Sequence, residues 1–101
     1  MVQYEFEAEL WIWDARRVDT WTFVTLPADA ASEIRELAPA LPRGFGSVRV
    51  EVTVGGSTWR TSIFPDARSG SYVLPIKKAV RRAESLEPGE PVAVRLELVD
   101  F

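Results

Sequence analysis

Any chemistry in this chain has to come from cations, hydroxyls, carboxylates and tryptophans, because the sequence contains neither histidine nor cysteine. Those absences remove the commonest general base and the thiolate ligands of metal sites. Two glycines beside an arginine predict an anion-binding segment, in which backbone N–H groups approach the ligand closely, at Arg43-Gly44-Phe45-Gly46-Ser47. The alternative is a glycine-bent strand at a corner of a sheet, because the segment lacks the lysine of a P-loop.

A second candidate is the segment Thr58-Trp59-Arg60-Thr61-Ser62. Strand alternation places Arg60 and Ser62 on one face and Trp59 on the other, towards the core. A surface of arginine, serine and threonine suits a phosphate or a carboxylate. The competing interpretation pairs Arg60 with an acid of the first strand, such as Glu7 or Glu9.

A third candidate is the polar side of a helix predicted after Pro75. Lys77 with Arg81, and Lys78 with Arg82, are like-charge pairs four residues apart, and each pair destabilises a helix by a few tenths of a kcal/mol. A bound anion would compensate for this repulsion. The alternative is a solvated face whose late arginines suit the negative end of the helix dipole.

The fourth candidate is aromatic. Trp11 and Trp13 fall on the glutamate face of the first predicted strand, and Trp21 follows shortly after them. Such side chains line a ligand pocket or a partner surface, or else they are covered by one of the helices.

No set of residues has the spacing of a catalytic site. Ser62 with Lys77 as its base, or acid–base work by carboxylates, would be the remaining routes to an enzyme. The sequence therefore leaves enzymatic activity undecided and favours a non-enzymatic protein. We expect no catalytic residue, no metal ligand and no cofactor.

The 101 residues suffice for one domain, residues 1–101. Alternating apolar residues predict strands over 3–13, 48–54 and 92–98, an aromatic and β-branched run predicts one over 21–26, and shorter runs predict strands over 58–64 and 71–74. Gly55-Gly56 predicts a hairpin. Short helices are predicted after Pro27, with Asp29 or Ser32 near the cap, and after Pro75.

Two segments of the chain resemble each other. Phe23-Val24-Thr25-Leu26-Pro27 matches Tyr72-Val73-Leu74-Pro75, and each precedes a short helix and a valine-rich strand. The predicted fold is mainly β with two short helices: a small closed or double-split β-barrel built from two pseudo-symmetric strand–Leu-Pro–helix–strand halves, about residues 3–54 and 57–99. Chance similarity is the alternative.

The net charge of −3 is unevenly distributed. Residues 1–37 hold eight acids and three bases, residues 38–83 hold two acids and eight bases, and residues 84–101 hold five acids and one base. The basic middle favours an anionic ligand, or the segments pair with one another across the sheet. No signal-peptide pattern and no membrane-length apolar run is present, so we expect a cytoplasmic protein.

The second repeated segment, Val73 to Ala83 with the turn Glu87-Pro88-Gly89-Glu90, resembles the swapped-hairpin pattern of AbrB/MazE-type proteins, with Glu90 in place of the usual aspartate. That resemblance implies a double-split barrel of a kind that often binds DNA as a dimer. Here the two hairpins would be joined in one chain, which favours a monomer.

The chain from about residue 4 to 99 also resembles the bacterial domain-of-unknown-function family DUF1905. The resemblance rests on Leu10-Trp11, Trp21 to Pro27, Gly44 to Val50, Thr58 to Pro65, Gly70 to Pro75 and Lys77 to Arg81. It implies a double-split barrel that can be fused to a bacteriocin-protection-like domain. Ser85-Leu86 stands where the family usually has Gly-Ile, which affects only that local turn.

The resulting functional expectation is a small binding module that holds an anionic or aromatic ligand, or a peptide, in a barrel groove. The residues expected at the groove are Arg43, Gly44, Phe45, Gly46, Arg60, Ser62, Lys77, Arg81, Trp11 and Trp13. A nucleic-acid-binding regulator, suggested by the AbrB/MazE resemblance, is an alternative that the overall acidity disfavours. A protein-partner or structural module without a small ligand is the other alternative.

Overall fold

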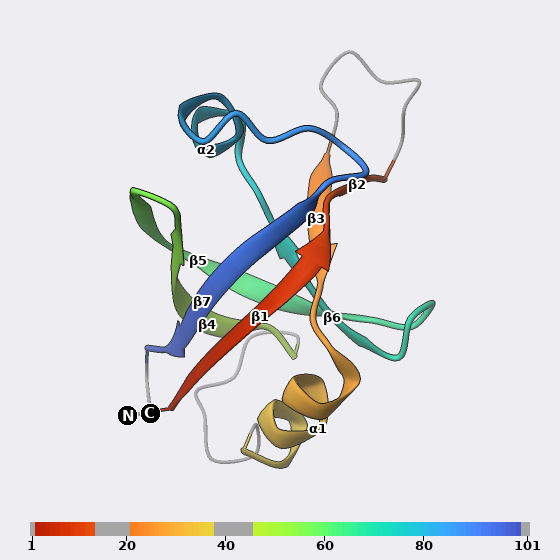
Figure 1. Ribbon diagram of the computed structural model, residues 1–101. Coiled ribbons are helices and arrows are strands. Elements are labelled where there is room, and N and C mark those ends of the chain that lie inside the picture. The colour runs from red at the N-terminus through yellow and green to blue at the C-terminus, as the bar shows by residue number, and fades with distance from the viewer. Residues whose placement is uncertain (1, 14–20, 38–45, 100–101) are drawn as a thin grey trace.

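The computed structural model describes residues 2–13, 21–37 and 46–99, and in this part the chain is mainly β with two helices (Figure 1). The elements in chain order are β1 (Gln3–Glu9), β2 (Trp11–Ile12), β3 (Thr22–Thr25), α1 (Ala28–Leu37), β4 (Val48–Val54), β5 (Ser57–Asp66), β6 (Ser71–Pro75), α2 (Lys78–Ala83) and β7 (Pro91–Leu98).

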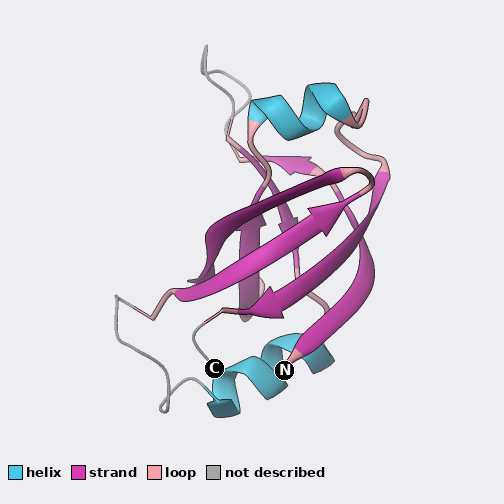
Figure 2. Cartoon of the chain, turned by 90° about the vertical axis from the view of Figure 1, so that its left-hand side faces the viewer, coloured by secondary structure: helices cyan, strands magenta, loops and turns pink. Residues whose placement is uncertain are grey.

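All the strands belong to one antiparallel sheet with the order β1-β7-β4-β5-β6-β3-β2. Only Leu10 separates β1 from β2 in the sequence, yet these strands stand at opposite ends of that order. The sheet therefore has to curl so that its two ends meet at Leu10, whose N–H and carbonyl bond Glu90 O and Gly89 N at 3.0 and 2.7 Å. This curled sheet confirms the predicted barrel-like architecture (Figures 1 and 2).

The core fills the concave side of the sheet, where the alternating residues of each strand meet. Every second residue of β4 and of β7 is buried, as their valine and leucine spacing predicts. Leu10, Val24, Leu74 and Ile63 join them at full or nearly full burial. Trp59 packs against this core, so the predicted inward orientation of that tryptophan is confirmed.

The two helices cover opposite ends of the curled sheet (Figure 2). Helix α1 buries Ala30, Ala31 and Ile34. Asp29 lies inside its first turn, where the carboxylate accepts a hydrogen bond from Ala30 N at 2.9 Å. Helix α2 buries Val80, and Ile76 is buried just before the helix begins.

The two similar segments of the sequence lie side by side as β3 and β6. Val24 is opposite Leu74, and Thr25 is opposite Val73. Hydrogen bonds extend this ladder at both ends, because Leu26 N donates to Tyr72 O and Ile76 N donates to Thr22 O, at 3.0 and 2.9 Å. When Leu26-Pro27 is aligned with Leu74-Pro75, Thr25 corresponds to Val73, so the antiparallel pairing of the two segments brings these equivalent residues opposite each other.

The predicted Gly55-Gly56 hairpin is present between β4 and β5. Gly55 has a φ of 57°, and a Cβ at this residue would collide with the carboxylate of Glu84, which bonds Gly56 N at 3.3 Å and Ser57 Oγ at 2.7 Å. The return strand extends beyond its predicted end at Phe64 to Asp66. Pro65 is tolerated there because this end of β5 pairs with β6 on one side only, so no ladder bond needs its missing N–H.

Candidate ligand-binding site

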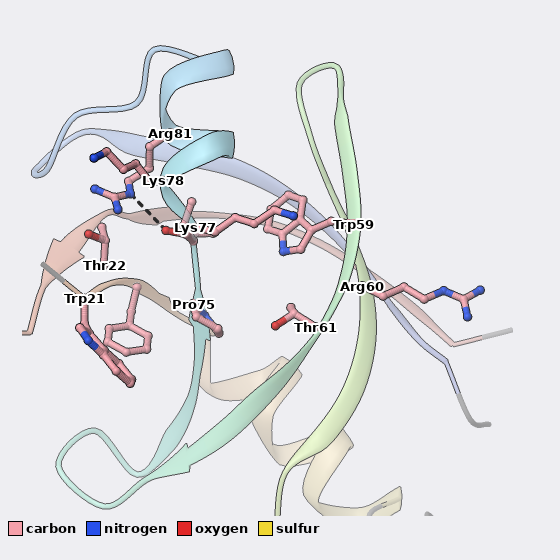
Figure 3. Close-up of a pocket in the computed structure, with 11 residues that line it drawn as sticks. Trp21, Thr22, Trp59, Arg60, Thr61, Pro75, Lys77, Lys78 and Arg81 are labelled. Atoms are coloured by element: carbon pink, nitrogen blue, oxygen red, sulfur yellow. Dashed lines mark hydrogen bonds between the residues drawn. The ribbon is translucent and has the colours of Figure 1, made fainter. Parts of the chain in front are cut away.

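An opening forms where β5 separates from β6. Strand β5 pairs with β4 from Ser57 to Ile63, but it pairs with β6 only from Phe64 to Asp66. The earlier part of β5 therefore diverges from the end of β6, and a cavity of about 340 Å³ occupies the space between them (Figure 3). We call it the cationic pocket; its lining residues are Trp21, Thr22, Phe23, Trp59, Arg60, Thr61, Pro75, Ile76, Lys77, Lys78 and Arg81.

Four cationic residues and no described carboxylate line this pocket; the cations are Arg60, Lys77, Lys78 and Arg81. Lys77 and Lys78 stand at the start of α2, and the Lys77 side chain extends towards Trp59 (Figure 3). Arg81 follows one turn later, and its Nε donates to Ile76 O at 3.2 Å. Within the described residues Lys77, Lys78 and Arg81 form no ion pair, so the described lining of the pocket is positively charged.

Arg60 contributes to the pocket wall, but its guanidinium points away from the pocket (Figure 3). Its Nε lies 3.3 Å from Glu51 Oε1. The interpretation that pairs Arg60 with Glu7 or Glu9 of the first strand is therefore wrong. Glu51 is directly opposite Arg60 in the β4–β5 ladder, so it is the nearer acid.

Ser62 shares the outer face of β5 with Arg60 and lies opposite Arg49. It does not line the cationic pocket, whereas Lys77 does. The structure therefore does not bring together Ser62 and Lys77, the serine and the base that an enzymatic mechanism would require.

Next to the pocket, the outer side of the sheet carries a cluster of aromatic residues on β2 and β3. Trp11 is opposite Phe23, with ring centroids 5.2 Å apart, and its Nε1 donates to Thr25 Oγ1 at 2.9 Å. Trp13 and Trp21 extend the cluster, 6.5 Å apart. They are 54% and 62% exposed, so the interpretation that a helix covers these tryptophans is wrong for this pair.

A second hollow of about 400 Å³, the aromatic groove, runs over this cluster, lined by Trp11, Trp13, Trp21, Phe23, Pro65, Asp66 and Val73. It shares Trp21 and Phe23 with the cationic pocket. The two hollows are therefore adjacent, one lined by cations and the other by aromatic side chains.

The far end of the aromatic groove carries a carboxylate. Asp66 Oδ2 accepts hydrogen bonds from Ser69 Oγ at 2.8 Å and from Ser69 N at 3.2 Å. The hydroxyl bond is the main reason that the pKa of Asp66 lies below its usual value, so the side chain is anionic at neutral pH. A hollow shared with Trp11 and Trp13 continues past Asp66 to Arg68 and Ser69.

Most of this chain matches a known protein family. The model of that family, which is described as a domain of unknown function, DUF1905, matches residues 6–96. The chain belongs to the DUF1905 family. No curated protein matches it. The match confirms the family suggested by the sequence, while the relation to AbrB/MazE-type barrels stays a prediction.

The other predicted site residues of this DUF1905 domain lie elsewhere. Arg43, Gly44 and Phe45 are outside the described residues. Gly46 has a φ of 80°, a backbone conformation that favours glycine and that fits the bent-strand alternative. In the described part of the chain, no three carboxylates gather to hold a metal ion, and no helix is long and apolar enough to cross a membrane.

Sequence reasoning did not assign Phe23, Pro75 and Asp66 to the site. Phe23 and Pro75 looked like core and helix-start residues, and only the β3–β6 register, in which they are opposite each other, places both beside the pocket. Phe23 could have been identified from the sequence because it lies two residues after Trp21, and this spacing puts both rings on one face of a strand.

Proposed function

We propose that this DUF1905 domain is a binding module that holds an organic anion with an apolar or aromatic part. The observation that carries this proposal is the adjacency of the two hollows, which share Trp21 and Phe23 as lining residues. The anionic group would lie beside Lys77, Lys78 and Arg81, and the apolar part would pack on the exposed indole of Trp21. A few convergent polar groups in a largely apolar hollow are typical of ligand sites.

The energetics of α2 support the same proposal. Lys78 and Arg82 lie four residues apart in a helix of six residues, and both are exposed. Repulsion between them lowers stability, and no described acid relieves it. A bound anion is the partner that makes this arrangement favourable.

The nucleic-acid alternative has weaker support. A polyanion needs cations along its whole path, but among the described residues Asp66 is the one charged residue that lines the aromatic groove, and it is negative. The net charge of −3 also opposes a polyanion. DNA binding stays a prediction, and its test is a steep loss of binding with salt.

Indole N–H resonances test the proposal directly, because the chain has four tryptophans. We would titrate the protein with phenyl phosphate, phenylacetate and the neutral phenylacetamide and follow these signals by NMR. The signals of Trp21 and Trp59 should move with both anions, with affinities of about 1 mM expected for fragments of this size. Phenylacetamide should bind about tenfold more weakly, because it lacks the charge.

The matched variants are Lys77→Gln with Lys78→Gln, and Arg95→Gln as the control. Arg95 lies on the outer face of β7, where it forms an ion pair with Glu5 at 3.6 Å. The double variant should lose the preference for anions, and Arg95→Gln should keep it. Equal binding of phenylacetate by all three proteins would contradict the proposal.

A further inference from the structure

We propose that the ligand is a segment of a protein partner: an extended peptide with large apolar side chains over the aromatic groove and at least two carboxylates at one end, beside Lys77, Lys78 and Arg81. This inference rests on the proposed function and names the class of ligand. The occupant is therefore an acidic, aromatic-rich peptide segment.

The openness of the surface is the first argument for a peptide. Small ligands are mostly enclosed by concave pockets, which cover most of their surface. Here Trp13 and Trp21 keep 54% and 62% of their surface exposed. An exposed aromatic cluster of this kind is typical of surfaces that another protein covers, and tryptophan is enriched among residues that dominate binding energy.

The extent of the surface is the second argument. Three hollows follow one another: the cationic pocket, the aromatic groove that shares Trp21 with it, and the hollow at Arg68 that shares Trp11 and Trp13 with the groove. Each alone measures about 340 to 400 Å³, which is the size of a small-ligand pocket. An extended chain can occupy all three at once.

The charges give the peptide a direction. Three cations without described ion-pair partners at one end attract more than one carboxylate, as electrostatic complementarity requires. At the other end Asp66 is anionic, because the Ser69 hydroxyl bond and, to a smaller extent, backbone bonds from Ser69 and Arg68 and the charge of Arg68 lower its pKa. Asp66 therefore favours a hydrogen-bond-donating group on the end of the peptide remote from the acids, while Arg68 beside it opposes a strongly cationic one.

The same charges argue against two other occupants. A single-stranded nucleic acid would stack its bases on the tryptophans, but it would also carry phosphates past Asp66. A second copy of this chain, docked antiparallel and face to face, would offer its described groove carboxylate, Asp66, to three cations. An acidic peptide avoids the repulsion of phosphates by Asp66 and supplies more carboxylates than the second copy does.

The experiment is a selection from a random twelve-residue peptide library displayed on phage, against the wild-type protein and against Lys77→Glu/Lys78→Glu. Peptides from the wild type should combine tryptophan, phenylalanine or leucine with two or more acids at one end. Peptides from the charge-reversed protein should have bases in place of those acids. The winning peptide, made synthetically, is then measured by fluorescence anisotropy.

That peptide should bind Lys77→Glu/Lys78→Glu and Trp21→Ala at least about tenfold more weakly than the wild type. Asp66→Asn should weaken it about threefold, because a rim charge matters less than the central anchor. Arg95→Glu, on the outer face of β7, is the matched control and should leave the affinity unchanged.

Each other outcome has a distinct meaning. If phenylacetate binds but selection enriches no acidic–apolar peptide, the peptide inference fails and the proposed function survives. If neither binds, both fail. If a thymidine oligonucleotide binds more tightly than the peptide, and its affinity falls steeply with salt, the ligand is a nucleic acid and the inference is overturned.

Discussion

Helices α1 and α2 occupy matching places in the fold but carry opposite charges. Each follows a Leu-Pro pair, and each covers one end of the curled sheet (Figure 2). The second residue after the proline is Asp29 in one case and Lys77 in the other, and the sixth is Glu33 or Arg81. The same two positions therefore hold two acids near α1 and two cations near α2.

The difference shows that the fold does not dictate the charge at these positions. A helix with a net negative or a net positive charge can cover an end of the sheet. The need to cover the sheet therefore does not explain the cations of α2. Folding requires the apolar residues of each helix, such as Ile34 and Val80. The cations of α2 are better explained by something outside the chain, which is the basis of the proposed binding site.

The largest effect should come from the two matched leucines, Leu26 and Leu74, which are 2% and 0% exposed. Leu26→Ala and Leu74→Ala should each lower the free energy of unfolding by about 2–5 kcal/mol, because each leaves a cavity in the core. Urea denaturation measures both. If one substitution lowered the free energy of unfolding by about 2 kcal/mol more than the other, the two segments would not be structurally equivalent.

A smaller effect distinguishes the cations of the two helices. Arg35 of α1 donates to Gly70 O at 2.6 Å and lies over the Tyr72 ring at 6.0 Å, so it has a structural role. Arg35→Ala should cost about 0.5–1.5 kcal/mol. Arg82→Ala, in the exposed part of α2, should change stability by less than about 0.5 kcal/mol in the same thermal or urea assay.

Tyr4 gives a test that depends on pH. Its hydroxyl is buried without a partner among the described residues, and burial, followed by the charge of Glu33, raises its pKa above the usual value near 10. The pKa of Tyr4 is therefore higher in the folded state than in the unfolded state. The protonated hydroxyl contributes fully to the free energy of unfolding below about pH 10, and this contribution is lost as the pH rises through the folded-state pKa.

Tyr4→Phe should therefore keep more of its stability above pH 10 than the wild type keeps. At pH 7 it should match the wild type or exceed it by up to about 1 kcal/mol, because an unsatisfied buried hydroxyl is removed. Urea denaturation at pH 7 and pH 10.5 measures both effects. Glu33→Gln is the control that removes the α1 charge alone; if it left the alkaline loss unchanged, the contribution of that charge would be refuted.

The smallest effect should come from Lys78→Glu, which makes α2 more like α1. Glutamate four residues before Arg82 replaces a repulsion with an attraction, so the free energy of unfolding should rise by a few tenths of a kcal/mol. Anion binding should weaken in the same protein. A clear loss of stability instead would mean that the cation serves the fold, and the contrast between the helices would lose its functional meaning.

Much of the architecture was predictable because it follows from periodicity. The alternation in β1, β4 and β7, the Gly55-Gly56 turn and the breaks at Pro27 and Pro75 are local signals, and the structure confirms each. The extension of β5 through Pro65 was not predictable, since it depends on which side of the strand lacks a neighbour.

The candidate site was predictable only in part. Lys77, Arg81, Trp11 and Trp13 were identified from residue type and do line the two hollows. The ion-pair partner of Arg60 was missed because Glu51 becomes its neighbour only through the β4–β5 register. Asp66 was missed because its position at the end of the groove is set by contacts between distant strands.

The pairing of β1 with β7 constrains how the protein is made. β1 is synthesised before all the other strands described here and β7 after them, so Gln3 can pair with Glu97 only when β7 has been made. Until then β1 and the exposed tryptophans that follow it present apolar surface to solvent or to a chaperone. We therefore expect this domain to complete its fold only after β7 has been synthesised, and to be most prone to aggregation before that point.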